Sequence, residues 1–319
     1  MTGRRTRVAV IGGGQNCEHE VSLASAAAAA AALDPGRYDV VALTIGVDGG
    51  WRDERDRPIG LAAAVEVLRG CDVALPLVHG PRGEDGTLAA LLDLAGVPYA
   101  GSGLAAGAVA MDKWVTKLVA EAIGIATAPG VLLTAATAAA YTWSHPVVVK
   151  PVSAGSSQGV ARVDHPGQLA AALDGALALD RRVLVEDVVE GREVDVAVLA
   201  RADGTRIVAP ALEIVVAGGL FDYATKYGGS AVFRVPAPLS EAERTALEQA
   251  ALATYDALGC RGVARVDFFL TADGPVLNEV NTTPGLTGQS QVPRMFAAAG
   301  LPYPGLLDVL VQDALVGAS

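Results

Sequence analysis

Residues 277–285 read LNEVNTTPG and place an acid and an amide two positions apart, directly before a turn. Because side chains alternate between the two faces of a strand, Glu279 and Asn281 should share one face, with Leu277 continuing that face inward and Val280 on the other. Two oxygen-bearing side chains on one face suggest a cation. Magnesium prefers oxygen ligands and commonly bridges protein carboxylates to nucleotide phosphates, which directs the search to phosphate-binding segments.

The stretch is the second half of an expected β-hairpin, ARVDFFLTADGPVLNEVN, with an Asp-Gly turn signal at 273–274. If those two residues were the whole loop, Asp267 would face away from Glu279 and Asn281. A loop of odd length or a β-bulge would bring all three to one face, and we predict such an irregularity. The alternative is a set of exposed polar residues on a sheet edge.

Two glycine-rich segments are candidates for anion binding. In VVVKPVSAGSSQGV, Lys150 ends an apolar strand, and the following Gly/Ser loop can point its amides at phosphate. It is not a Walker A sequence, and such a loop alone is more often a hairpin turn. The N-terminal VIGGGQNCEHEVSLAS leads from a strand into a helix but lacks the dinucleotide fingerprint, which disfavours a Rossmann cofactor site.

Three single residues stay ambiguous from local sequence. Glu18 could bind a substrate ammonium or cap the helix that follows it. His79 lies at the carboxyl end of a predicted strand and could be a ligand or a bystander. Cys17 has no histidine partner that spacing would assign to it, so an inert thiol is favoured.

Composition narrows the function classes. The 319 residues allow two or three domains, and the formal charge of −11 offers no cationic surface for nucleic acid or anionic lipid, which favours a small-molecule substrate. The alanine-rich segments are too short and too weakly apolar to cross a bilayer, and the N-terminus lacks signal-peptide features, so we expect a cytoplasmic protein. The three cysteines lie far apart, which argues against disulfides or a zinc site.

The order of expected elements divides the chain into three units. Residues 1–103 alternate strands and helices, as in a small parallel α/β layer. Residues 104–190 start with a helical stretch and continue through three strands. Residues 191–319 hold further strands, a helix near 240–258 and the hairpin. Within this last unit, VAGGLFDYATKYGG (216–229) is typical of an ordered functional loop or lid.

Eight segments, in this order, resemble those of D-alanine–D-alanine ligases of the ATP-grasp superfamily: EHEVSLAS, HGPRGEDGT, YAGSG, AMDK, KPVSAGSSQG, FDYATKY, ARVDFF and NEVNTTPG. Each is weak alone, but their joint order over nearly the whole chain is highly specific. The resemblance implies an α/β fold, α+β in the C-terminal half. The implied fold is a three-domain ATP-grasp fold with a Rossmann-like (pre-ATP-grasp) N-terminal domain, followed by the central and C-terminal ATP-grasp subdomains. The resemblance also implies a homodimer, with ATP between the central and C-terminal domains.

The same resemblance implies a reaction in two steps. The γ-phosphate of ATP passes to the carboxylate of one D-alanine, and the amine of a second D-alanine attacks the acyl phosphate, giving the dipeptide for peptidoglycan precursors. Such chemistry needs metal ions and lysines around the phosphates and cations near the oxyanion. One alternative is a dipeptide ligase with another second substrate. A second is a nucleotide-binding protein without catalysis, which would require the loss of a metal ligand or of Arg265.

Matching positions carry the family's roles onto this chain. Magnesium, as two ions that manganese could replace, would be held by Asp267, Glu279 and Asn281. The nucleotide would be bound by Lys113, Lys150, Ser157, Glu186, Glu193 and Lys226. The first two lysines would grip the α/β phosphates, Glu186 and Glu193 would contact adenine and ribose, and Lys226 would reach the γ-phosphate from the lid.

The substrate side is assigned in the same way. The D-alanines would be bound by Glu18, His79, Tyr227, Arg265, Gly285, Ser290 and Gln291. Direct catalytic roles would fall to Glu18, Ser156, Tyr227, Arg265 and Ser290. Tyr227 resembles the form that accepts D-alanine second, whereas Gln291 stands where the family usually has an apolar residue. An extra amide there could change which second substrate fits.

Overall fold

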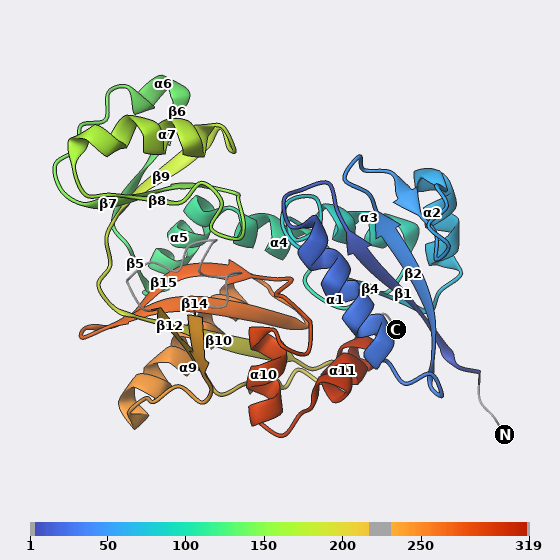
Figure 1. Cartoon of the computed structure of the whole chain (residues 1–319). Helices are drawn as coiled ribbons and strands as arrows, with labels where there is room; N and C mark the ends of the chain where they lie inside the picture. Colours follow the sequence, from blue (N-terminus) through green and yellow to red (C-terminus); the bar gives the residue numbers. More distant parts are fainter. Residues whose placement is uncertain (1–3, 217–230, 318–319) are drawn as a thin grey trace.

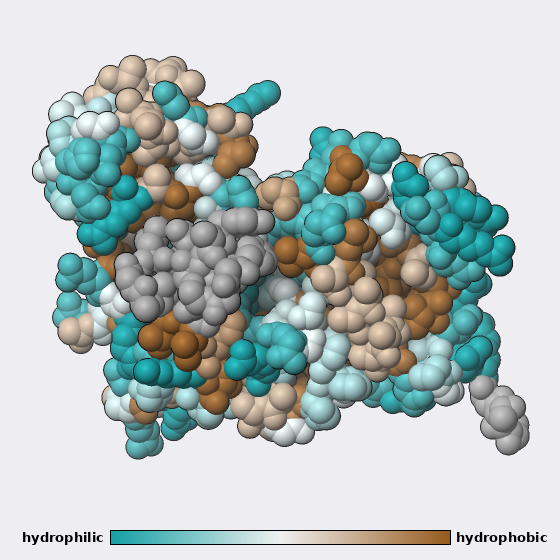
Figure 2. Space-filling model, viewed as in Figure 1, coloured by the Kyte–Doolittle hydropathy of each residue, from teal (hydrophilic) through white to brown (hydrophobic). Residues whose placement is uncertain are grey.

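The computed structural model describes residues 4–216 and 231–317 and contains three β-sheets (Figure 1). The N-terminal sheet, a small sheet within residues 130–187 and a larger sheet lie around a common centre (Figure 1). The space-filling view shows a hollow between the unit that holds the small sheet and the N-terminal unit (Figure 2). None of the described helices combines the length and the apolar character needed to span a membrane.

The N-terminal sheet has the order β3-β2-β1-β4. β1 pairs in parallel with β2 and β4, whereas the short edge strand β3 is antiparallel to β2. Residues 8–11 of β1 are at most 1% exposed, as expected for a parallel strand that is covered on both faces. The predicted parallel α/β layer is confirmed. Its elements are β1 (Thr6–Gly13), α1 (His19–Ala32), β2 (Tyr38–Ile45), β3 (Trp51–Arg52), α2 (Gly60–Arg69), β4 (Val73–Pro76) and α3 (Thr87–Ala95).

The helical stretch expected next is divided into α4 (Leu104–Met111) and α5 (Lys113–Ala122). Asp112 has an extended backbone between them, and its side chain caps α5 by accepting a hydrogen bond from the Val115 N–H at 3.0 Å. Alanines of both helices pack against the core of the large sheet. This division places Lys113 at the first position of α5, at the centre of the molecule.

The small sheet is antiparallel, in the order β6-β9-β7-β8, and α7 packs on it. It has a hydrophobic core of its own, which includes Val149, Leu173 and Val183. Its loop 153–159 extends from the end of β7. The elements are β6 (Gly130–Thr134), α6 (Ala135–Ala138), β7 (Val147–Pro151), β8 (Ala161–Val163), the 3₁₀ turn η1 (Pro166–Gln168), α7 (Leu169–Leu177) and β9 (Arg182–Asp187).

The large sheet has the order β13-β12-β10-β14-β15-β5, with β11 paired to β10. The expected helix is present as α9, which begins at a capping box between Ser240 and Glu243 and packs on the sheet. The elements are β5 (Ala126–Thr127), β10 (Arg192–Ala200), β11 (Arg206–Val208), β12 (Leu212–Val216), β13 (Ala231–Arg234), α9 (Glu241–Ala257), β14 (Val263–Thr271) and β15 (Gly274–Asn281).

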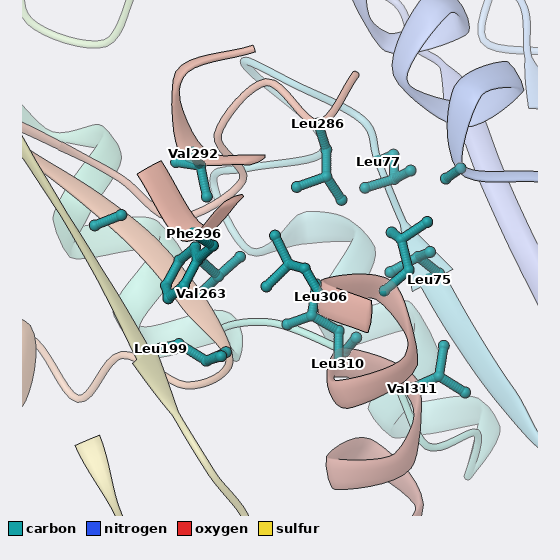
Figure 3. Close-up of a cluster of buried hydrophobic side chains, with 14 of the residues drawn as sticks. Leu75, Leu77, Leu199, Val263, Leu286, Val292, Phe296, Leu306, Leu310 and Val311 are labelled. Carbon is teal, nitrogen blue, oxygen red and sulfur yellow. The ribbon is translucent and has the colours of Figure 1, made fainter. Parts of the chain in front are cut away.

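A shared core joins the first and third units (Figure 3). It brings Leu75 and Leu77 of the N-terminal unit against Leu306 and Leu310 of α11, and it continues to Phe296 of α10. The two helices are α10 (Gln291–Ala298) and α11 (Tyr303–Val316). Because these side chains form one buried cluster, the N-terminal unit and the large sheet are held together by hydrophobic packing as well as by polar contacts.

Candidate active site

The β14–β15 hairpin contains the predicted irregularity. Asp267 pairs with Glu279, but the next residue on β14 pairs with Leu277, so Asn278 is the extra residue of a bulge. The turn lies at residues 272–273, one position before the expected Asp-Gly pair. The bulge brings Asp267, Glu279 and Asn281 to one face. The expectation that Leu277 continues that face was wrong, because the bulge moves Leu277 into the core beside Val280.

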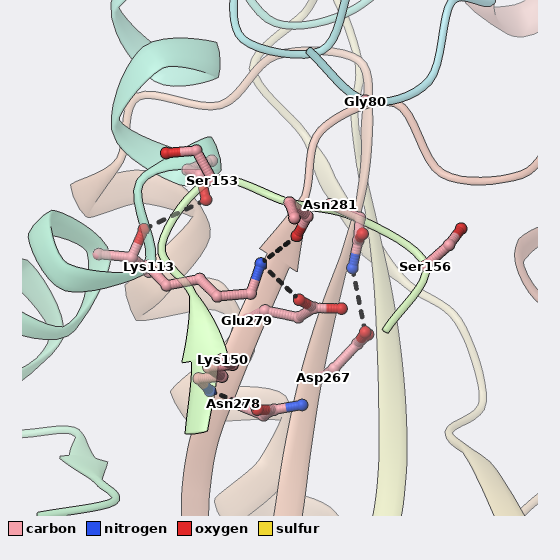
Figure 4. Close-up of polar contacts among 12 residues, drawn as sticks. Gly80, Lys113, Lys150, Ser153, Ser156, Asp267, Asn278, Glu279 and Asn281 are labelled. Carbon is pink, nitrogen blue, oxygen red and sulfur yellow. Dashed lines mark hydrogen bonds and ion pairs between the residues drawn. The ribbon is translucent and has the colours of Figure 1, made fainter. Parts of the chain in front are cut away.

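The predicted metal ligands lie on neighbouring strands (Figure 4). The Asn281 Nδ2–H donates to Asp267 Oδ2 at 3.0 Å, and Glu279 Oε2 lies 3.1 Å from Lys113 Nζ. In the described residues, no group of three or more His, Cys, Asp or Glu side chains is arranged to hold a metal ion. Two carboxylates and one amide oxygen nevertheless form the hard donor set that suits magnesium when phosphate supplies the remaining ligands.

A third acid, Asp195 of β10, extends this arrangement. It pairs directly with Asp267, which in turn pairs with Glu279, so three carboxylates lie side by side across β10, β14 and β15. Like charges placed opposite each other destabilise a sheet unless cations lie between them. Here Arg265 contacts both Asp195 and Asp267, and Lys113 pairs with Glu279.

The Arg265 guanidinium is buried and held by acids. Its Nε and Nη2 each donate to a carboxylate oxygen of Asp267 at 2.6 Å, and Nε lies 3.5 Å from Asp195 Oδ2. Burial works against the charged form, but Asp267 and Asp195 outweigh it and raise the pKa of Arg265 well above its ordinary value. The site therefore contains a permanent cation.

Lys113 is the second cation at the centre. Its Nζ donates to the Ala154 carbonyl of the loop 153–159 at 2.9 Å and pairs with Glu279. Burial would lower the pKa of Lys113, but the charge of Glu279, and then those of Glu84 and Glu18, outweigh it and raise the pKa. The lysine stays charged and connects the loop to the hairpin.

A buried carboxylate, Glu186, forms ion pairs with two more lysines. Glu186 Oε2 lies 2.6 Å from Lys150 Nζ, and its Oε1 lies 2.7 Å from Lys117 Nζ. Burial would raise the pKa of Glu186, but Lys150 and then Lys117 lower it. Lys150 also donates to Asn278 Oδ1 at 3.3 Å, so the bulge residue contacts a lysine that we predict to bind phosphate (Figure 4).

Glu18 does not cap α1. It occupies the N-cap position without a side-chain capping bond, and its carboxylate instead accepts a hydrogen bond from Ser156 Oγ at 2.5 Å. A Cβ added to Gly155 would lie 2.3 Å from Glu18 Oε2, and one added to Gly80 would lie 2.6 Å from it. Both glycines are needed for this close approach. Ser156 has a φ of +51°, a strained conformation that carries its hydroxyl to Glu18.

His79 and Glu84 link the N-terminal unit to the turn after β15. His79 Nδ1 lies 2.7 Å from the Thr283 carbonyl oxygen and Nε2 lies 2.8 Å from Ser25 Oγ. Glu84 accepts hydrogen bonds from the N–H groups of Thr283 at 3.1 Å and Gly80 at 3.2 Å. Burial, followed by the charge of Glu18, raises the pKa of Glu84 to about 7.

Two adjoining cavities are lined by most of the predicted site residues. The larger, of about 710 Å³, is lined by the nucleotide-side set Lys113, Lys150, Ser157, Glu186 and Glu193, together with Asp267 and Glu279. The smaller, of about 180 Å³, is lined by the substrate-side set Glu18, His79, Ser156, Arg265, Gly285, Ser290 and Gln291, together with Glu279 and Asn281. The residues that line both are Lys113, Ala154, Arg265, Glu279 and Gln291. The predicted lid residues Lys226 and Tyr227 lie outside the described residues.

Ser290 and Gln291 begin α10 at the smaller cavity. Ser290 Oγ accepts a hydrogen bond from the Thr287 N–H at 3.0 Å and lies 2.8 Å from the Thr287 hydroxyl. Gln291 is 8% exposed, and its amide contacts both Arg265 and Asp195.

Sequence reasoning missed four residues of the site: Lys117, Glu84, Asp195 and Asn278. Two of them carry a readable signal. Lys117 is four positions after Lys113 and so lies on the same side of α5. Asp195 lies in REVDVAVLA, whose alternation places it opposite the valines of the core. Glu84 and Asn278 acquire their positions only through a turn and a bulge.

Two cavities that meet at a lysine, an arginine and a carboxylate define the class of protein: an enzyme that binds a phosphate-rich ligand next to a second, smaller substrate. The comparisons identify the family. The sequence model described as D-ala D-ala ligase C-terminus matches residues 121–312, and the one described as D-ala D-ala ligase N-terminus matches residues 7–64 and 53–102. The chain belongs to the D-alanine–D-alanine ligase family.

Relatives agree over the full length. In an alignment of 359 positions, the chain is 40% identical to a D-alanine–D-alanine ligase of Mycobacterium sp. (strain KMS). The alignment covers 98% of this chain and 97% of the relative. Among solved structures, the VanG D-Ala:D-Ser ligase from Enterococcus faecalis has a TM-score of 0.86 at 32% identity, covering 98% of this chain and 100% of that one. A D-alanine–D-alanine ligase from Bacillus anthracis complexed with ATP has a TM-score of 0.79 at 30% identity, covering 97% of each chain.

Proposed function

We propose that this chain ligates two D-alanines to D-alanyl-D-alanine with ATP, through an acyl phosphate, and supplies the dipeptide for peptidoglycan precursors. The observation that carries this proposal is the junction of the two cavities at Lys113, Arg265 and Glu279. A phosphoryl group that moves from a nucleotide in the larger cavity to a carboxylate in the smaller one passes between two fixed cations. Family membership over the full chain supports the same reaction.

ATP occupies the larger cavity in this proposal. Lys113 and Lys150 neutralise the α/β phosphates, and the loop that holds Ser157 covers them with backbone amides. Glu193 contacts the ribose. Glu186 lies on the adenine side and keeps Lys150 oriented through the ion pair already described. Lys226 reaches the γ-phosphate.

In this proposal Asp267, Glu279 and Asn281 would hold magnesium as two ions. When bound, the ions would neutralise the phosphate charge that builds up during phosphoryl transfer. The fit rests on the donor set: two carboxylates and an amide oxygen on one face, at the side of the cavity where the lysines lie. Manganese, which accepts the same oxygen ligands, can replace it.

The two D-alanines lie in the smaller cavity. Glu18 binds the ammonium of the first, with His79 beside it, and Ser156 fixes the Glu18 carboxylate. Arg265 stabilises the oxyanion that forms when the second amine attacks, because a buried forked cation interacts strongly with a developing negative charge. Gly285, Ser290 and Gln291 border the second substrate. Tyr227 closes the site from the lid.

We also propose the cellular setting of the enzyme. Its substrates are D-alanine and ATP, and family membership supports a homodimer in the cytoplasm. The formal net charge of −11 supports the proposal that neither nucleic acid nor membrane is a partner. We keep the domain bounds 1–103, 104–190 and 191–319 as a prediction, with the active site among all three. Limited proteolysis with mass mapping tests the bounds, and light scattering tests the dimer.

The deciding experiment measures ADP release by the purified protein with ATP and magnesium. D-alanine, L-alanine, D-serine and D-lactate are supplied singly and as pairs with D-alanine, and products are identified by mass. We expect D-alanine-dependent turnover that yields D-alanyl-D-alanine. Turnover only with a D-alanine plus D-serine or D-lactate pair would move the protein to a different pathway, and no turnover with any pair would refute catalysis.

A further inference from the structure

Gln291 makes two contacts that a substrate-facing amide would not need. Its Oε1 accepts a hydrogen bond from Arg265 Nη1 at 2.7 Å, and its Nε2 donates to Asp195 Oδ2 at 2.8 Å. All three side chains are buried, with exposed fractions of 8% for Gln291, 7% for Arg265 and 1% for Asp195. Both ends of the amide are therefore bound within the protein.

These contacts give Arg265 two separate supports. On one side, Asp267 binds it through Nε and Nη2. On the other, Gln291 binds Nη1 and is itself held by Asp195 on the neighbouring strand. Three of the five guanidinium N–H groups donate in these bonds, and an arginine can use the others for a ligand.

We propose that Gln291, held by Asp195, is a positioning residue that fixes Arg265 at the junction of the two cavities. This inference rests on the proposed function, because it concerns the oxyanion partner of that reaction. Asp267 is a proposed magnesium ligand, so its oxygens cannot serve Arg265 alone in the loaded enzyme. Gln291 and Asp195 form the support that does not depend on Asp267.

The charge arrangement explains why an amide suits this position. A carboxylate at 291 would accept from Arg265 equally well but would oppose Asp195 at hydrogen-bonding distance, and a buried like-charge pair is costly. An apolar side chain at 291 would remove the acceptor of the Arg265 Nη1–H and the donor to the Asp195 carboxylate, so both hydrogen bonds would be lost. The amide accepts on one side and donates on the other, which matches the cation and the anion that flank it.

The test uses the full chain, four test variants and one control variant. Gln291→Met removes both hydrogen bonds at similar volume. Gln291→Glu keeps the bond to Arg265 but repels Asp195. Asp195→Asn is then combined with each of these two substitutions. Beside Gln291→Glu, the new asparagine can donate a hydrogen bond to the glutamate and so restore the bond between positions 195 and 291. Beside Gln291→Met, it can restore no bond, because methionine offers no comparable acceptor. Gln249→Met, an exposed position on α9, is the matched control.

We expect Gln291→Met to lower kcat about 10- to 100-fold, below the loss caused by removing an oxyanion donor outright. Binding of ADP with magnesium, measured by calorimetry, should change less than about twofold, because Gln291 lies where the two cavities meet and the proposed nucleotide contacts are made by other residues. Gln291→Glu should lose a similar amount of kcat, and Asp195→Asn should restore at least about fivefold in the glutamate background alone. Melting temperatures report whether each variant is folded.

An unchanged kcat in Gln291→Met would overturn the inference, as would an equal effect of Asp195→Asn in both backgrounds. If the methionine variant does not fold, the comparison between Gln291→Glu and its double variant still decides. A wild-type chain that is inactive with every substrate pair would refute the proposed function instead. An active wild type with an unaffected methionine variant would refute only the positioning role.

Discussion

Burial changes the protonation of single residues in the site, and Glu84 is the clearest case. Its carboxylate lies in the smaller cavity near Glu18 and accepts two backbone hydrogen bonds. Burial outweighs those bonds and raises its pKa from 4.5 to about 7. The folded chain therefore holds a proton that the unfolded chain releases between those two values, so folding is favoured less as the pH rises through this window.

This sign predicts a pH-dependent loss of stability in the ligand-free protein. Below about pH 4.5 Glu84 is protonated in both the folded and the unfolded chain. Above about pH 7 the loss in the free energy of unfolding is complete and amounts to at most about 3 kcal/mol. In Glu84→Gln the free energy of unfolding should fall less between pH 5 and pH 8 than in the wild type. Urea unfolding at several pH values measures the free energy of unfolding, and Glu241→Gln, at an exposed position, is the control. Equal slopes in all three proteins would contradict the assignment.

At the scale of elements, the β14–β15 hairpin shows what a sequence can and cannot predict. Alternation alone requires an irregularity somewhere, because Asp267 and Glu279 otherwise face apart. Its position at Asn278 depends on packing, since Leu277 and Val280 both enter the core and one residue between them must be left over. The ordered motifs likewise predicted Glu18 and Ser156 as residues of the site, and the two side chains are in contact. The contact of Gln291 with Asp195 could not be predicted, because it joins a helix to a strand 96 positions away.

Deleting Asn278 tests the bulge. Without it, Leu277 opposite Phe268 is followed directly by Glu279 opposite Asp267, so the proposed metal ligands keep their face. We expect a folded, active protein whose KM for ATP rises about fivefold, because Lys150 loses one hydrogen bond. Inserting one glycine after Glu279 should instead exchange the faces of Val280 and Asn281 and lower turnover more than about 100-fold. Steady-state kinetics and melting curves distinguish the two, and equal losses would contradict the register argument.

At the scale of the whole molecule, the three sheets are not joined equally. The N-terminal unit and the large sheet share one hydrophobic core, and His79, Glu84 and Tyr38 add polar bonds between them. The small sheet has a separate core and meets its neighbours through polar contacts such as Ser156 with Glu18 and Lys150 with Asn278. Polar contacts of this kind open at lower free energy than a shared core, so the small sheet is the unit that should move.

A nucleotide that spans the larger cavity should therefore protect the small sheet selectively. We expect ADP with magnesium to slow hydrogen exchange in β7, β9 and the loop 153–159, with little change in β1, β4 and α11. The bound ligand adds contacts to the small sheet, whereas β1, β4 and α11 are held by hydrophobic packing that does not depend on the ligand. Without ligand, Ser156→Ala should speed exchange in the same loop, whereas Ser144→Ala at the surface should not. Exchange measured by mass spectrometry resolves these segments. Uniform protection over all three sheets, or no effect of Ser156→Ala, would mean that the molecule behaves as a single rigid unit.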